Sequence, residues 1–91
     1  MNEALATLLR MTEQFMNAHG SAFPSLKRKL ASNQELAKQL KMGLRQAIDS
    51  GSVSTSRYER LTDTEFESDE EVQDWYRAVW DYLYEDGPEP E

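Results

Sequence analysis

The chain contains a single histidine, His19, and no cysteine. Histidine titrates near neutral pH and is the usual general base or metal ligand. No serine or threonine forms a recognised nucleophile motif with His19, and no second histidine can complete a metal pair. The lack of cysteine excludes disulfides, thiolate nucleophiles and cysteine-based zinc sites. We interpret His19 as a helix-end residue placed favourably against the helix dipole, and we expect neither an enzyme nor a cofactor.

The acidic run 63–74 follows the ligand spacing of a calcium-binding EF-hand loop. Its carboxylates are Asp63, Glu65, Glu67, Asp69, Glu71 and Asp74. The position that requires glycine for the sharp turn is Ser68, and the last position holds Asp74 where a bidentate glutamate is needed. Helix capping accounts for most of these acids locally. We therefore predict no metal site, and the run 63–74 is where a metal ion would bind if that prediction is wrong.

The middle of the chain carries a stripe of basic residues at helical spacing. This stripe consists of Lys27, Arg28, Lys38, Lys41 and Arg45. Such a stripe can contact phosphates, and segment 34–48 has some features of a helix-turn-helix. However, Gly43 comes two residues later than the turn glycine of that motif, and leucines and an isoleucine recur every four residues without a break. One continuous helix is the simpler interpretation, and direct nucleic-acid binding is the less favoured alternative.

The segment 74–86 combines aromatic and acidic side chains. At helical spacing, Trp75, Tyr76 and Trp80 share one apolar face with Val79 and Leu83. Tyr82 and Tyr84 do not both fit on that face, so we expect at least one exposed aromatic ring. Exposed aromatic residues among carboxylates are typical of an interface. The predicted partner-binding residues are Asp74, Asp81, Tyr82, Tyr84 and Glu85.

The first half of the chain predicts three helices. Apolar residues at spacings of three and four predict an amphipathic helix over 3–18, with Gly20 as its left-handed C-terminal cap. Residues 24–31 are expected to form a short helix that begins with a proline. A capping box at Ser32–Glu35 opens the clearest helix of the chain. Gly43 lies near the apolar face of this helix and would permit another helix to pack closely.

The second half of the chain contains three further helix-start signals. Ser54 begins one helix, and capping boxes occur at Thr62–Glu65 and Ser68–Glu71. The acids of the last box oppose the positive end of the helix dipole. Gly87, followed by a proline, is expected to end the C-terminal helix.

These elements predict an all-α fold: a compact single-domain bundle of three main helices plus one or two short helices. No segment alternates with the period of two that a strand requires, and no internal repeat is present. A chain of 91 residues with 38% hydrophobic residues supports one domain. We place this domain at 1–87 and expect 88–91 to be a frayed acidic tail. Homodimerisation through a helix face remains open.

The net charge of −7 is unevenly distributed along the chain. Residues 1–60 contain nine basic and five acidic residues, whereas 61–91 contain one basic and twelve acidic residues. The asymmetry has two explanations: the acidic C-terminal helix lies near the basic middle segment of the same fold, or one pole docks a partner. The net charge argues against nucleic acids and anionic membranes as partners. No apolar run spans a bilayer and the N-terminus lacks a signal-peptide pattern, so we expect a cytoplasmic protein.

Together, these features favour a small acidic protein-binding module. We expect an inhibitor or adaptor that docks its acidic and aromatic helix face onto a basic, nucleic-acid-handling protein. A mobile-element counter-defence protein, similar in role to an anti-CRISPR inhibitor, is one example. The alternatives are a transcriptional regulator that binds nucleic acid through the basic segment 27–45, and an immunity or antitoxin protein. The sequence contains no catalytic or ligand motif that favours one of these roles. Each role is therefore named by analogy with known small proteins.

Overall fold

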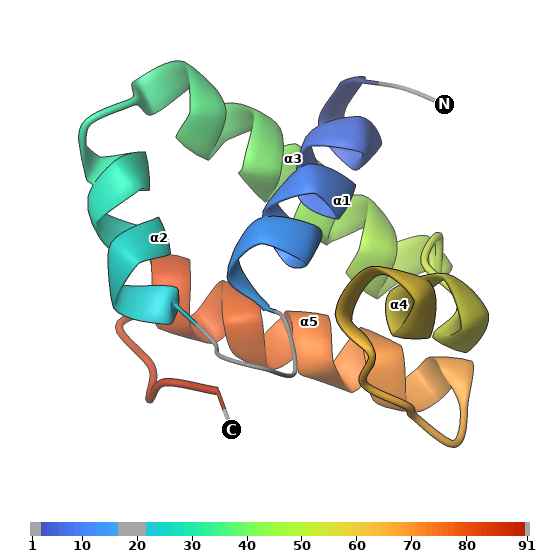
Figure 1. Cartoon of the computed structure of the whole chain (residues 1–91). Helices are drawn as coiled ribbons and strands as arrows, with labels where there is room; N and C mark the ends of the chain where they lie inside the picture. The colour runs from blue at the N-terminus through green and yellow to red at the C-terminus, as the bar shows by residue number, and fades with distance from the viewer. Residues whose placement is uncertain (1–2, 17–21, 91) are drawn as a thin grey trace.

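The computed structural model describes residues 3–16 and 22–90 and confirms the all-α prediction for them. These residues form five helices and no strand: α1 (Glu3–Phe15), α2 (Phe23–Ala31), α3 (Gln34–Ser50), α4 (Thr55–Thr62) and α5 (Asp69–Tyr84). α1, α3 and α5 are the long helices, whereas α2 and α4 have 9 and 8 residues. α1 packs across α3, and α5 runs beneath them from the α4 side to the α2 side (Figure 1). None of the described helices is long and apolar enough to cross a membrane.

Gly43 lies where α1 crosses α3. A Cβ atom added to Gly43 would overlap the carbonyl oxygen of Ala4 and would lie 2.9 Å from the Cβ of Leu8. The lack of a side chain at this position therefore lets the two helices approach closely. This confirms the role predicted for Gly43.

Two hydrogen bonds fix α5 antiparallel to α3. Near the start of α5, Gln73 Nε2 donates to the carbonyl of Ile48, with an N···O distance of 3.2 Å. Near its end, the Tyr84 hydroxyl donates to the carbonyl of Ala37 at 2.9 Å. These bonds join the beginning of each helix to the end of the other, so the residues of α5 can be placed level with those of α3.

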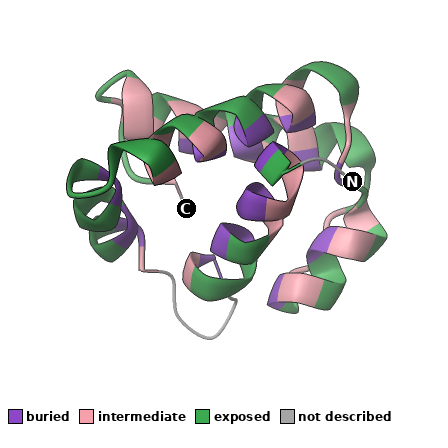
Figure 2. Ribbon diagram, turned by 90° about the horizontal axis from the view of Figure 1, so that it is seen from above, coloured by how far each residue is buried: buried purple, intermediate pink, exposed green. Residues whose placement is uncertain are grey.

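The core lies where the helices face one another, and the outer faces are exposed (Figure 2). The apolar residues with no more than 1% exposure are Leu8, Phe23, Leu26, Leu40, Leu44, Ala47, Val53, Tyr58, Val72, Tyr76 and Val79. One buried polar contact crosses this core: the hydroxyls of Thr12 and Tyr76 are 2.8 Å apart and join α1 to α5. Burial raises the pKa of Tyr76, and the hydrogen bond with Thr12 opposes that rise. The phenol is therefore neutral in the fold.

An aromatic cluster packs α2 and α4 against α5. The ring of Trp75 lies 5.8 Å from Phe23, 6.4 Å from Tyr58 and 6.3 Å from Phe66, measured between centroids. The Tyr58 and Phe66 rings are 5.1 Å apart. Trp75 Nε1 is buried and has no hydrogen-bond partner among residues 3–16 and 22–90, so this indole acts through ring packing.

Two of the predicted helix starts are confirmed. Ser54 caps α4, where its side chain accepts from the Arg57 amide at 3.2 Å. Ser68 caps α5 by accepting from the Glu71 amide at 3.3 Å. The Glu71 carboxylate accepts from the amide of Glu67, at 3.0 Å, instead of from Ser68 itself. The box therefore begins α5 at Asp69, as the pattern predicts, but its reciprocal bond reaches the residue before the cap.

The other two capping-box predictions are wrong. α3 is capped by Asn33, whose Oδ1 accepts from the Leu36 amide at 3.1 Å, while Ser32 donates to the carbonyl of Lys29. Thr62 begins no helix, because it is the buried last residue of α4 and its hydroxyl donates to the Tyr58 carbonyl at 2.8 Å. The prediction of a capping box at Thr62 was wrong because a threonine hydroxyl can also donate to the backbone carbonyl one helical turn earlier.

The predicted ends of the first and last helices also change. α1 ends at Phe15 instead of residue 18, and the predicted cap Gly20 lies outside the described residues, as does His19. At the end of α5, the left-handed residue is Asp86, with φ of 55°, and not the glycine that follows it. The amide of Gly87 then donates to the Asp81 carbonyl at 2.7 Å, which turns the chain back along α5.

Candidate protein-docking face on α5

Two of the predicted acidic site residues, Asp74 and Asp81, lie on the outside of α5, and the third, Glu85, is the residue that caps its C-terminal end. Asp74, Asp81 and Glu85 are all exposed. Their spacings of seven and four residues correspond to advances of about 10 Å and about 6 Å along the axis and keep them on one side of the helix. We call these three residues the carboxylate face. The sequence predicted this arrangement correctly because it depends only on helical geometry.

Local ion pairing neutralises one of the three carboxylates. Arg77 Nη1 is 2.8 Å from Asp74 Oδ1, and both side chains are more than half exposed. An exposed pair of this kind contributes little to stability. Within residues 3–16 and 22–90, Asp81 and Glu85 form no ion pair, so their charges face solvent.

The two tyrosines of the predicted site are turned inward. Both are half-buried, so the expectation that one of them is exposed is wrong. Tyr82 packs edge-on against Phe23 at 5.8 Å. Tyr84 lies 5.2 Å from Trp80 and donates to α3, and burial raises its pKa to about 12. α2 and α3 cover these rings, which a helical wheel of α5 alone could not reveal.

The predicted basic stripe is divided between α2 and α3. Lys27 Nζ lies 4.6 Å above the centre of the Tyr82 ring, and Lys41 Nζ lies 5.4 Å from the centres of both Trp80 and Tyr84. Such contacts bring part of the basic middle segment beside the acidic helix. This agrees with the structural explanation of the charge asymmetry.

The other three members of the stripe are exposed on α2 and α3. Arg28 donates to Ser25 on its own helix at 3.2 Å. Arg45 Nε is 3.7 Å from Asp49 Oδ2, with side-chain exposures of 72% and 67%. Lys38 is also exposed on α3. On α3 the exposed cations Lys38, Lys41 and Arg45 follow one side of the helix, and we call them the basic ridge.

A groove of about 290 Å³ lies between Arg45 of the basic ridge and Asp81 of the carboxylate face. Its lining residues are Arg45, Ile48, Asp49, Arg77, Trp80 and Asp81. Met42 lies beside this groove and is 48% exposed. Among the described residues, it is the one large apolar side chain that is exposed. Methionine, arginine and tryptophan are typical interface residues. Sequence reasoning missed the groove, because it exists only once α3 and α5 are paired.

A second hollow, of about 440 Å³, lies on the other side of the carboxylate face. It is lined by Ala78, Asp81, Pro88, Glu89 and Pro90. The chain after α5 therefore runs beside the helix and brings the Glu89 carboxylate near its outer surface. Whether 88–91 frays in solution stays a prediction.

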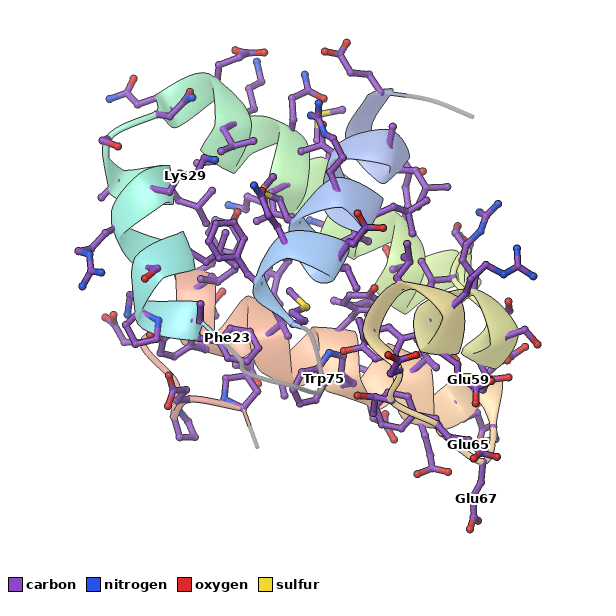
Figure 3. All side chains as sticks on the ribbon, in the orientation of Figure 1. Phe23, Lys29, Glu59, Glu65, Glu67 and Trp75 are labelled. Atoms are coloured by element: carbon purple, nitrogen blue, oxygen red, sulfur yellow. The ribbon has the colours of Figure 1, made fainter. Side chains whose placement is uncertain are left out.

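Two carboxylates of the acidic run 63–74, those of Asp69 and Glu71, accept hydrogen bonds from backbone amides. Asp69 Oδ1 accepts from the amide of Thr55 at 3.0 Å, which holds the start of α4 against the start of α5. Glu59, Glu65 and Glu67 project from the α4 end of the molecule, away from Lys29 of α2 (Figure 3). In the part of the chain that the structure describes, no three acidic or histidine side chains are grouped to hold a metal ion.

Comparison with known protein families, curated proteins and solved structures finds no match to this chain. The chain's own surface is therefore the basis for assigning its function. Its most distinctive features are the carboxylate face, the basic ridge and the groove between them.

Proposed function

We propose that the chain is a small protein-binding module that docks the carboxylate face of α5 onto a basic surface of a partner protein. The supporting observation is the line of exposed carboxylates, Asp74, Asp81 and Glu85, on a helix held rigidly by the core. Two of the three charges have no ion pair within the described residues. A preorganised row of charges increases the association rate with a basic surface and favours that partner over acidic ones.

The charge of this face suits a partner that binds nucleic acid. A protein groove lined with lysine and arginine attracts a row of negative charges, whether these are phosphates or carboxylates. Occupation of that groove by α5 would block the nucleic acid, which makes inhibition the expected consequence of binding.

The test is capture of partners from nuclease-treated lysate by the wild-type chain and by a variant with Asp74→Lys, Asp81→Lys and Glu85→Lys. We expect the wild type to retain basic nucleic-acid-binding proteins, which added DNA or salt releases, and the variant to lose them. The matched control carries Glu59→Lys, Glu65→Lys and Glu67→Lys, which alter exposed side chains at the α4 end by the same total charge.

Three results decide the outcome. Loss of capture in the α5 variant but not in the control supports the proposal, provided that circular dichroism shows equal helix content. Equal capture by both variants removes the carboxylate face from the mechanism. Capture of acidic or uncharged proteins alone would contradict the proposed partner chemistry.

Nucleic-acid binding through the basic segment 27–45 remains the second candidate. It has less support because Lys27 and Lys41 hold their ammonium groups over rings of α5. A gel shift with DNA and RNA at low salt tests it. Binding that weakens steeply with salt and is lost in Lys38→Glu/Arg45→Glu would favour this function over protein docking.

A further inference from the structure

The carboxylate face and the basic ridge lie side by side. Each carboxylate lies at nearly the same position along the helix axes as one cation of the ridge. The bonds from Gln73 to Ile48 and from Tyr84 to Ala37 set the register of the antiparallel pair α3 and α5. In that register, each acidic residue can be assigned the α3 residue that lies at the same position along the helix axes. This α3 residue is about 47 for Asp74, about 40 for Asp81 and about 36 for Glu85. Each carboxylate is thus within about two residues, or about 3 Å along the axis, of a basic-ridge position. These positions are Arg45, Lys41 and Lys38.

We propose that this surface is the interface of a symmetric homodimer. The two copies are related by a twofold rotation axis that runs parallel to α3 and α5 in the plane of contact. This rotation places α5 of one copy on α3 of the other. Each residue keeps its position along the direction of the axis. The carboxylate face of each copy then meets the basic ridge of its partner. Three pairs, Asp74 with Arg45, Asp81 with Lys41 and Glu85 with Lys38, each occur twice.

The neighbouring groups fit this arrangement. Met42, which is 48% exposed, is level with about residue 79 and would be covered by the second copy's α5. The groove residue Trp80 is half-buried and would also be covered. The existing pairs Arg45–Asp49 and Arg77–Asp74 are exposed, so rearranging them costs little. Self-complementary charge thus identifies a second copy of this chain as the occupant of the face.

This inference goes beyond the proposed function and does not depend on it. A second copy and a basic partner would compete for the carboxylate face, but each is measured separately. The dimer is tested with the purified chain alone, whereas partner capture requires a lysate. Failure of one leaves the other standing.

The test measures molar mass by light scattering after gel filtration, over a range of protein concentrations. At low salt we expect the mass to rise from the 10.5 kDa of one chain towards twice that value. At about 1 M salt, where the Debye length is about 3 Å, the dimer fraction should fall at least severalfold. Mass that stays at one chain at low salt, up to about millimolar protein, would overturn the proposal.

Charge-reversal variants identify the interface. Lys38→Glu/Arg45→Glu makes both surfaces acidic, and Asp81→Lys/Glu85→Lys makes both basic, so each variant alone should be monomeric. Mixed in equal amounts, the two should form a heterodimer, because both sets of contacts then join opposite charges. A mixture that stays monomeric, or a single variant that still dimerises, contradicts the arrangement.

Variants with the same charge changes outside the face serve as controls. Arg28→Glu/Arg60→Glu and Glu59→Lys/Glu65→Lys alter exposed side chains on α2, on α4 and in the loop after α4. Each should dimerise as the wild type does. If these controls also become monomeric, net charge and not the face governs association, and the proposed interface is wrong.

Discussion

Replacing Gly43 by alanine tests the close crossing of α1 and α3. Alanine raises helix propensity by about 1 kcal/mol over glycine, so an isolated helix would gain stability. In the fold, the new methyl group overlaps the Ala4 carbonyl and comes within 2.9 Å of Leu8 Cβ. The carbonyl belongs to the helix backbone and cannot rotate away, so α1 must shift. Overpacking typically costs about 1–3 kcal/mol, and a clash with helix backbone lies in the upper part of that range, at about 2–3 kcal/mol. After the gain in helix propensity, we expect a net loss of about 1–2 kcal/mol.

The assay is thermal and urea unfolding followed by circular dichroism. For a domain of this size, 1 kcal/mol moves the Tm by about 4–8 °C, so Gly43→Ala should melt about 5–15 °C below the wild type. Met42→Gly and Met42→Ala form the matched control at the exposed neighbouring position, where the alanine variant should be the more stable by about 1 kcal/mol. If alanine stabilises at both positions, Gly43 does not set the spacing of the two helices.

Three further predictions concern other contacts. Tyr76→Phe leaves the buried Thr12 hydroxyl without its partner and should lower the unfolding free energy by about 1–2 kcal/mol in urea melts. The double variant Thr12→Val/Tyr76→Phe should lose less unfolding free energy than the sum of the losses in the two single variants. Asn33→Ala should cost about 1 kcal/mol as the loss of a cap, whereas Ser32→Ala should cost clearly less; the reverse order would restore the predicted capping box. Burial raises the pKa of Tyr84 to about 12, above the roughly 10 of an exposed tyrosine, so the folded chain keeps its proton after the unfolded chain has lost it. The unfolding free energy should therefore fall from about pH 10 to about pH 12, and Tyr84→Phe should flatten part of that fall; an unchanged slope would contradict the burial of this ring.

The sequence predicted those features that depend on one helix at a time. Helical spacing placed Asp74, Asp81 and Glu85 on one side of α5, and Ser54 and Ser68 were recognised as caps because both precede a clear helix. Gly43 was recognised because it lies near the apolar face of its helix, where the lack of a side chain permits another helix to pack closely.

The remaining features depend on contacts between elements. Ser32 and Asn33 are both good caps, and local sequence does not decide which of two adjacent candidates is used. Tyr82 and Tyr84 were expected to expose at least one ring because a helical wheel does not show that α2 and α3 reach the flanks of α5. The groove between α3 and α5 arises from the register set by two side-chain hydrogen bonds to backbone carbonyls, a kind of contact that has no periodic signal in the sequence.

The two tryptophans give the chain a pair of built-in optical reporters. Trp75 lies within the aromatic cluster, and its buried Nε1 has no hydrogen-bond partner in the part of the chain that the structure describes. Its emission should therefore report whether α2 and α4 remain packed on α5. Trp80 lines the groove beside Lys41, so its emission should respond to anything that covers the groove. Single Trp→Phe variants would separate the two signals, and unfolding and surface occupation could then be followed in one unlabelled sample.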